Sequence, residues 1–444
     1  MKKLALVLSF VAAVAALGAP SARAEIGTVD QVPAATLLLP NFEVDYLNPN
    51  AASTTITINN ASATATLAHV TLWTDEAIPT FTFDVYLTGY DVQQVNLNSL
   101  FATGNLPVTA DAGSDPTETI SPQGDLSQDI NFPATGIPTC DGTYSSPALT
   151  QAELKHVRAA HSGKRSAILG GCAGAQYGDN LARGYVTIDL ANDCTPLNPA
   201  SAGYFAGPAG NSNLLWGDYT VTDPTNNFEW GGSLVHIESC GGPIAVGNGA
   251  GLCPFAPGDY TFYGRYVAFT AADQREPLAT NFAVRYANGG PDSADTDFTV
   301  WRDTKLPPTG ANGKHNCKKD PSWFPLAQTD VVAFDHQENP VDLCFLTDNV
   351  SPPIGGPQTC LPLATQRASI ADGTTLGASL DVPFSSGWLF LNLNHVVAGD
   401  PLPGLAQAWV EVAQTSQGRF AAGFHALPLD NAASVNAGGV ILIP

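Results

Sequence analysis

Apolar residues recur at every second position in many short stretches of this 444-residue chain. Between 81 and 87, for example, Phe81, Phe83, Val85 and Leu87 fall on one face of an extended segment, and polar residues fall mostly on the other. Similar patterns occur at 54–59, 67–73, 184–190, 261–269, 281–286, 298–301, 388–393 and 408–412. With 42 glycines and 34 prolines to form turns, this periodicity predicts a mainly β fold of two or more antiparallel, Ig-like β-sandwich domains with many loops.

One short helix is predicted after residue 150. Thr150 and Glu153 have the spacing of a capping box, in which each side chain caps the other's backbone N–H. Leu154, Val157 and the alanines that follow supply an apolar stripe up to Gly163.

The first 24 residues have the three parts of an export signal. Two lysines precede an apolar run at 4–17, and the small-residue pattern Ala22-Arg23-Ala24 follows. The run is shorter than the roughly 18 to 20 apolar residues that a membrane helix needs, and no later stretch reaches that length. We therefore expect a signal peptide at 1–24 and no membrane span. The expected location is extracellular, at the cell surface or periplasmic.

The charge of the chain is strongly acidic and unevenly distributed. Removing Lys2, Lys3 and Arg23 from 18 basic residues leaves 15 against 40 acidic ones, a formal charge of −25. This balance argues against a nucleic-acid partner. The segment 25–154 contains no Lys or Arg, so it must rely on solvent, salt or bound cations to offset repulsion. Basic residues concentrate at 155–165 and 305–319.

Eight cysteines occur in the chain, all of them after residue 139. An even number in an exported chain predicts up to four disulfides, with the pairing left open. The cysteines are Cys140, Cys172, Cys194, Cys240, Cys253, Cys317, Cys344 and Cys360. A Gly- and Pro-rich loop joins Cys240 to Cys253, which makes that pair the one specific expectation.

Loop-like composition at 110–138 and 351–362 suggests how the chain is divided. The predicted units are the signal peptide at 1–24, an acidic cysteine-free β-sandwich at 25–130 and a cysteine-containing β-rich middle domain at 131–350. A C-terminal β segment at 351–444 either stands alone or completes the first sandwich.

Several short motifs give the chain a likeness to other sequences. They are Asn-Phe-Glu-Val-Asp at 41–45, Leu-Ala-His-Val-Thr-Leu-Trp-Thr-Asp at 67–75, Asp-Val-Tyr-Leu-Thr-Gly-Tyr-Asp-Val at 84–92, Arg-Gly-Tyr-Val-Thr at 183–187 and Arg-Glu-Pro-Leu at 275–278. With these motifs the chain resembles a family of uncharacterised secreted bacterial proteins. The resemblance implies a bacterial, exported context and assigns no activity or site residue.

Calcium is the cofactor that the acidic composition favours, because it binds hard oxygen ligands from loops. The candidate ligands are Asp292, Asp295 and Asp297, and a looser set is Asp111, Asp115 and Glu118. Neither set has the spacing of an EF-hand, so the alternative is a solvated acidic turn.

Other chemistry has weaker support. His236 with Glu238, and Asp335 with His336 and Glu338, lack a third zinc ligand at a recognised spacing. Cys172 could act as a nucleophile with His156 or His161 as base, but a disulfide in its glycine-rich loop is the simpler interpretation.

No catalytic signature is present, so the leading hypothesis is a non-enzymatic extracellular or cell-surface protein, structural or adhesive. The alternatives are a secreted hydrolase acting on polysaccharide, or a sugar-binding module that uses some of the seven tryptophans and the aromatic run at 260–269. Surface glycans and other copies of the chain are the expected partners. A cleft holding two carboxylates about 5 to 10 Å apart would favour the hydrolase, and featureless convex sandwiches would favour the leading hypothesis.

Overall fold

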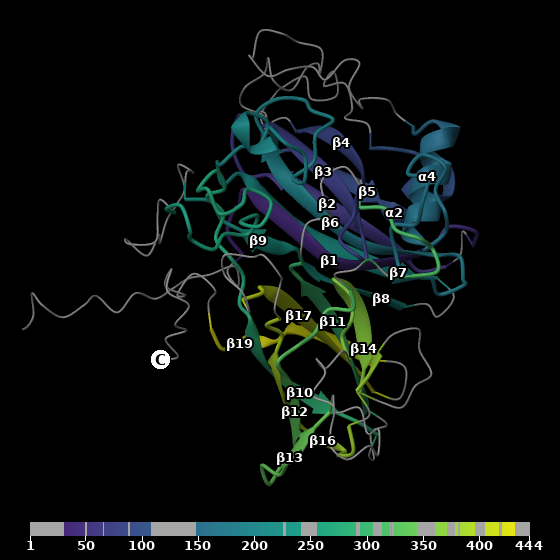
Figure 1. Cartoon of the computed structure of the whole chain (residues 1–444), viewed down its shortest axis with the longest axis vertical. Coiled ribbons are helices and arrows are strands. Elements are labelled where there is room, and N and C mark those ends of the chain that lie inside the picture. The colour runs from purple at the N-terminus through teal and green to yellow at the C-terminus, as the bar shows by residue number, and fades with distance from the viewer. Residues whose placement is uncertain are drawn as a thin grey trace, which may run out of the picture.

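A computed structural model confirms the mainly β fold and the antiparallel sandwiches predicted from the alternating pattern. It describes residues 31–48, 51–64, 66–87, 89–107, 148–224, 228–240, 255–289, 294–304, 313–319, 321, 324–343, 360–370, 378–380, 382–395, 405–416 and 420–430. The sheets form two pairs, one above the other in Figure 1. Resemblance to an Ig domain in particular stays a prediction.

The first pair consists of a five-stranded sheet in the order β4-β3-β6-β1-β9 and a four-stranded sheet in the order β5-β2-β7-β8. The strand bounds are β1 Thr36–Asp45, β2 Ser53–Asn60, β3 Thr66–Thr74, β4 Pro79–Leu87, β5 Val92–Asn96, β6 Leu181–Ala191, β7 Leu215–Asp223, β8 Phe228–Ser233 and β9 Val235–Ile237. Apolar side chains from both sheets fill the space between them, including Leu39 of β1, Ile56 of β2 and Val70 of β3. The alternation in 81–87 is confirmed, because the four apolar residues on its predicted inner face are all buried.

Two α-helices lie beside this first sandwich (Figure 1), α2 at Leu97–Thr103 and α4 at Gln151–His161. Helix α4 begins with the predicted capping box. Helix α2 was not predicted. It begins at Asn96, which accepts the backbone N–H of Ser99, and it ends at Gly104 in the left-handed region, with φ of 83°. A three-residue 3-10 helix, η3, spans Tyr204–Ala206.

The second pair of sheets has the orders β13-β12-β16-β10-β19 and β15-β14-β11-β17-β18. The bounds are β10 Asn281–Ala287, β11 Ala294–Arg302, β12 Asp330–Phe334, β13 Pro340–Asp342, β14 Thr365–Ser369, β15 Ala378–Ser379, β16 Ser386–Asn392, β17 Ala408–Ser416, β18 Phe420–His425 and β19 Leu427–Pro428. Inward-facing residues such as Val284, Phe298 and Leu389 form its core.

A third apolar cluster joins the two sandwiches and is rich in aromatic rings. Trp73 and Tyr185 lie on the outer face of the first sandwich and stack with ring centroids 5.6 Å apart. Tyr185 in turn contacts Trp301 of β11 edge to face, at 5.9 Å. Strands β3 and β6 are therefore buried on both faces, which explains why almost every residue in them is buried.

A buried polar network lies beside this aromatic cluster. The guanidinium of Arg275 is fully buried, with Nη1 3.1 Å from the carboxylate of Asp273 and Nε 3.7 Å from that of Asp189. Its Nη2 donates to the carbonyl of Gly210 at 2.9 Å, and Tyr204 donates its hydroxyl to Asp189 at 2.7 Å. Because buried charges are costly unless they are paired, this network fixes the segment around residue 275 against the first sandwich.

The aromatic run at 260–269 forms successive turns, so the strand predicted there was wrong. Ala268 and Phe269 have positive φ, and the backbone N–H of Tyr263 is bonded to the side chain of Asp273, so the chain cannot stay extended. The rings of Phe262 and Tyr263 are buried in the cluster between the sandwiches. This segment is rich in apolar residues because several of its sides are buried, and not because one face of a strand packs in a sheet.

The sheets divide the chain differently from the sequence-based ranges. The first pair takes strands from both sides of residue 130, because β6 to β9 join β1 to β5. The C-terminal strands β14 to β19 pair with β10, β11, β12 and with one another, and none of them joins the first sandwich. Residues 130 and 350, where the boundaries were expected, lie outside the described ranges, as does the predicted signal peptide at 1–24.

The acidic segment that lacks Lys and Arg receives its cations from later parts of the chain. Arg183 binds Glu43 at 3.0 Å, and Arg367 of the second sandwich lies 3.8 Å from the same carboxylate. Nε2 of His315 lies 2.7 Å from the buried carboxylate of Glu76. Folding therefore places local positive charge against a segment that has no Lys or Arg of its own.

Candidate functional site

A groove lies in the seam between the two sandwiches. Strands β11 and β17 pair with Trp301 opposite Trp409, Thr299 opposite Glu411 and Asp297 opposite Ala413, so these side chains share the outer face of their sheet. The two tryptophans pack against the first sandwich. Farther along the same face the side chains are small or polar, and there the groove opens.

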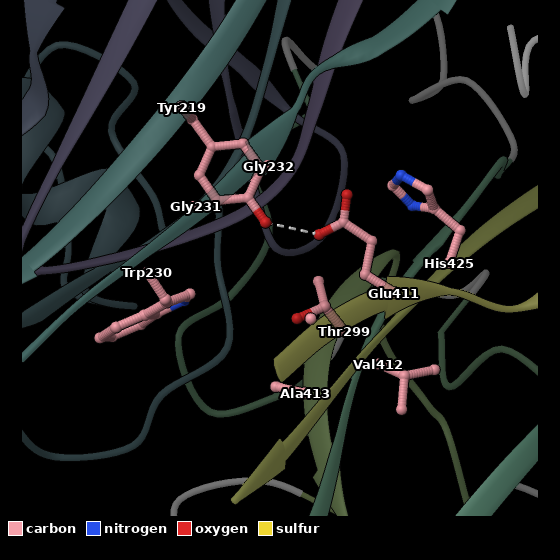
Figure 2. Close-up of a pocket in the computed structure, with 10 residues that line it drawn as sticks. Tyr219, Trp230, Gly231, Gly232, Thr299, Glu411, Val412, Ala413 and His425 are labelled. Carbon is pink, nitrogen blue, oxygen red and sulfur yellow. Dashed lines mark hydrogen bonds between the residues drawn. The ribbon is translucent and has the colours of Figure 1, made fainter. Parts of the chain in front are cut away.

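Tyr219 and Trp230 form the aromatic wall of the groove. Both come from the four-stranded sheet of the first sandwich, on β7 and β8, and both are half-buried. Figure 2 shows them on one side of the groove, with Glu411, Thr299 and His425 on the other. Gly231 and Gly232 follow Trp230 and also line the groove.

The groove consists of two adjoining hollows that share Tyr219, Trp230, Thr299, Glu411 and Ala413. Each hollow has a volume of about 110 Å³. That is several times the roughly 10 to 15 Å³ that one water needs on the same measure. The groove therefore has room for a ligand group larger than a few waters, in contact with an aromatic and a polar wall at once.

Glu411 is the central polar residue of the groove. One carboxylate oxygen accepts the hydroxyl of Tyr219 at 2.9 Å, across the seam, and the other accepts the indole N–H of Trp409 at 3.3 Å. Burial raises the pKa of Glu411 to about 7, although both hydrogen bonds lower it. Among the described residues no Lys, Arg or His lies within ion-pair distance of this carboxylate.

The other carboxylates of the groove do have cationic partners. Asp297 lies 3.4 Å from the guanidinium of Arg367, and Glu43 is bound by Arg183. Burial raises the pKa of Asp297, and the charge of Arg367 acts in the opposite direction. Arg367 itself is exposed at the groove and shared between these two acids.

His425 lies across from Glu411 in the pairing of β17 and β18. Its ring contacts that of Trp409, with centroids 5.1 Å apart. Partial burial of the ring lowers the pKa of His425, so the imidazole is neutral at pH 7 and adds no positive charge to the groove.

Five of the eight cysteines lie within the described residues. Cys172 and Cys317 form a disulfide, which links the loop after α4 to the segment that carries His315. Cys194, Cys240 and Cys360 are disulfide-bonded as well, and no described cysteine is free. Cys140, Cys253 and Cys344 lie outside the described residues, so the Cys240–Cys253 pairing stays a prediction.

The predicted calcium ligands are only partly described. Asp292 and the looser set at 111–118 lie outside the described residues. Asp295 accepts the backbone N–H of Thr296, and Asp297 faces Arg367 in the groove. No three His, Cys, Asp or Glu side chains within the described ranges are grouped to hold a metal ion. Calcium binding at Asp292, Asp295 and Asp297 stays a prediction.

The weaker catalytic and zinc candidates have structural roles. The disulfide of Cys172 removes it as a nucleophile, and His161 is buried between Thr80 and the carbonyl of Arg183. His236 accepts the backbone N–H of Gly217 at 3.1 Å, and burial lowers its pKa to about 4. Asp335 accepts the backbone N–H groups of the turn between β12 and β13.

Sequence reasoning did not single out Tyr219, Trp230, Arg367 or Glu411 as site residues. The one available signal was a charged residue, Glu411, in an otherwise apolar strand pattern at 408–412. Asp297 does stand out in the sequence, but as a calcium ligand.

None of the helices that the structure describes is long and apolar enough to cross a membrane. No protein-family model, curated protein or solved structure matches the chain.

Proposed function

We propose that this chain is an exported, non-enzymatic adhesive protein that binds a glycan in the groove between its two sandwiches. The observation that carries the proposal is the pairing of an aromatic wall, Tyr219 and Trp230, with a polar wall that contains Thr299, Asp297 and Glu411. A sugar ring offers apolar C–H faces and hydroxyl groups at its edge, so it matches both walls. Binding sites of small molecules commonly combine these two kinds of surface.

Two further features support an extracellular role. The Cys172–Cys317 disulfide is typical of proteins that mature in an oxidising compartment. The N-terminal pattern at 1–24 is that of a secretory signal. Self-association, the other partner expected from the sequence, is tested by measuring the molar mass of the purified protein in solution.

The test is calorimetric titration of the full mature chain with neutral and amino-sugar oligosaccharides. We expect at least one to bind, and Trp230→Ala to weaken that binding at least tenfold because the stacking surface is lost. The matched control is Trp388→Ala. Trp388 is also half-buried but stacks on Phe334 in the second sandwich, with ring centroids 4.1 Å apart, and does not line the groove. Absence of binding by all sugars, or equal loss in both variants, contradicts the proposal.

A second candidate is polysaccharide hydrolysis, favoured by the positions of Asp297 and Glu411. They are diagonal neighbours on one face of adjacent strands, and such neighbours lie about 7 to 8 Å apart. A carboxyl with a pKa of about 7 also suits a general acid.

We rank binding first because Asp297, the carboxylate that would have to act together with Glu411, is paired with Arg367. The deciding measurement is the release of reducing ends from soluble polysaccharides. Release that disappears in Glu411→Gln would establish the hydrolase and replace the first proposal.

A further inference from the structure

The groove has an excess of negative charge. Among its described lining residues, Glu43, Asp297 and Glu411 are acids and Arg367 is the only Lys or Arg. His425 is the remaining titratable base, and its lowered pKa leaves it neutral at pH 7. With its carboxylates ionised, the groove is therefore anionic, and an acidic sugar would meet net repulsion.

The three carboxylates of the groove differ in whether a cation lies beside them. Glu43 faces Arg183 and Arg367, and Asp297 faces Arg367, so each has a cation close by. Among the described residues the hydrogen-bond partners of Glu411 are neutral, the hydroxyl of Tyr219 and the indole of Trp409. A half-buried carboxylate with no counter-charge is the group in this groove that a bound cation would stabilise most.

The aromatic wall adds to this preference. Trp230 and Tyr219 line the same hollow as Glu411. The electron-rich faces of aromatic rings attract cations, and the attraction is stronger where water is excluded. Carboxylate and aromatic rings together favour an ammonium group over a neutral hydroxyl or amide at that point.

We infer that the ligand of the groove is an amino sugar chain with free amines, whose ammonium group binds the carboxylate of Glu411 beside Trp230 and Tyr219. This inference rests on the proposed glycan-binding function and specifies its ligand class. Arg367 is already paired with Asp297 and Glu43. An acidic sugar could bind this guanidinium only by displacing those two carboxylates.

The experiment compares three probes of equal length by calorimetry on the full mature chain at pH 7: β-1,4-linked glucosamine oligomers, their N-acetylated counterparts and β-1,4-linked glucose oligomers. We expect the free amine to bind at least tenfold more tightly than the other two. Glu411→Gln keeps the shape of the side chain and should remove this preference, so that the variant binds the glucosamine and glucose oligomers with affinities within about threefold of each other. Trp230→Ala should weaken the binding of all three.

A pH series adds a second readout. The groups facing Glu411 are Tyr219, Trp409 and His425, with Asp297 and Arg367 farther along the same face. A carboxyl with a pKa of about 7 loses most of its charge between pH 7 and pH 5, so the preference for the amine oligomer over the glucose oligomer should fall over that range. The glucose oligomer should change little.

The outcomes separate the two proposals. If glucose and glucosamine oligomers bind equally, or if Glu411→Gln retains the preference for the amine, the amino sugar inference fails and glycan binding stands. If no probe binds the unmodified protein, both fail. Tighter binding of an acidic sugar, such as a galacturonate oligomer, also overturns the inference.

Discussion

Replacing Arg275 by Met should destabilise the fold far more than replacing an exposed arginine. Its guanidinium is fully buried and faces two fully buried carboxylates, Asp189 and Asp273. Met fills a similar volume but leaves both acids without a cation. Removing one partner of a buried ion pair typically costs about 3 to 5 kcal/mol. For a unit of 150 to 250 residues each kcal/mol lowers the melting temperature by about 2 to 4 °C, so we expect a loss of about 6 to 20 °C at pH 7.

The loss should shrink at low pH. Burial raises the pKa of Asp273, and the charge of Arg275 acts against that rise, so the variant has an Asp273 pKa farther above the unfolded value of about 3.9. A group with a raised folded pKa costs nothing below its unfolded pKa, where both states are protonated, and its cost grows as the pH rises toward the folded pKa. The deficit should therefore be smallest near pH 4 and largest at pH 7 to 8.

Thermal unfolding of the full chain, followed by near-UV circular dichroism from pH 4 to 8, measures both effects. Arg285→Met is the matched control, because Arg285 lies exposed on β10 and should change the midpoint by less than 2 °C. The double variant Arg275→Met with Asp273→Asn should recover part of the loss, since one unpaired charge is gone. A loss below 2 °C in the single variant, or a double variant no more stable than the single one, would refute the reasoning.

Three other predictions concern bonds and ions elsewhere in the chain. Replacing Cys172 and Cys317 together by Ser should lower the free energy of unfolding by up to about 5 kcal/mol, the loop-entropy value for a separation of 145 residues. Unfolding in urea would measure this loss. Peptide mapping without reduction that recovers the two cysteines unlinked would contradict the prediction. Burial lowers the pKa of His315, but the hydrogen bond and charge of Glu76 raise it to about 9. This pair therefore stabilises the fold fully below pH 6.5 and loses its effect as the pH rises to 9. His315→Gln should abolish that dependence, and an unchanged pH profile of the melting temperature would contradict the prediction. If the three aspartates at 292–297 bind calcium, millimolar calcium should raise the melting temperature more than sodium chloride of equal ionic strength. Sodium chloride only screens the charges, over about 10 Å at 0.1 M, whereas a specific site also binds the ion. Equal melting temperatures in the two salts would reject the site.

The local elements could be predicted from sequence because their signals are local. The strands at 54–59, 67–73 and 81–87 follow from alternation, and α4 follows from Thr150 and Glu153. The aromatic run at 260–269 misled because its rings pack into a cluster between sandwiches, a long-range cause that mimics a strand pattern. Periodicity records how many sides of a segment are buried, and not which element buries them.

The division into sandwiches and the groove could not be predicted for the same reason. Nothing near Glu411 in the sequence indicates that Tyr219, 192 residues earlier, supplies its hydrogen bond. Asp297 stands out only through its acidic neighbours, and nothing in the sequence points to Arg367, which faces it. Many strand edges could pair with one another across more than a hundred residues, and a single sequence does not reveal which of these pairings forms.

The strand order of the first sheet also determines when this sheet can be completed during synthesis. β1 lies between β6 and β9, and Thr36 of β1 bonds to Asp189 of β6, 153 residues farther along the chain. At a synthesis rate of about 5 to 20 residues per second, roughly 8 to 30 s pass between the appearance of these two residues. During that interval both edges of β1 lack their hydrogen-bonded neighbours, and non-local pairing of this kind also folds slowly. A nascent chain shorter than about residue 237 therefore holds an unfinished sheet, and the cell that makes this protein must keep it from aggregating until β9 has emerged.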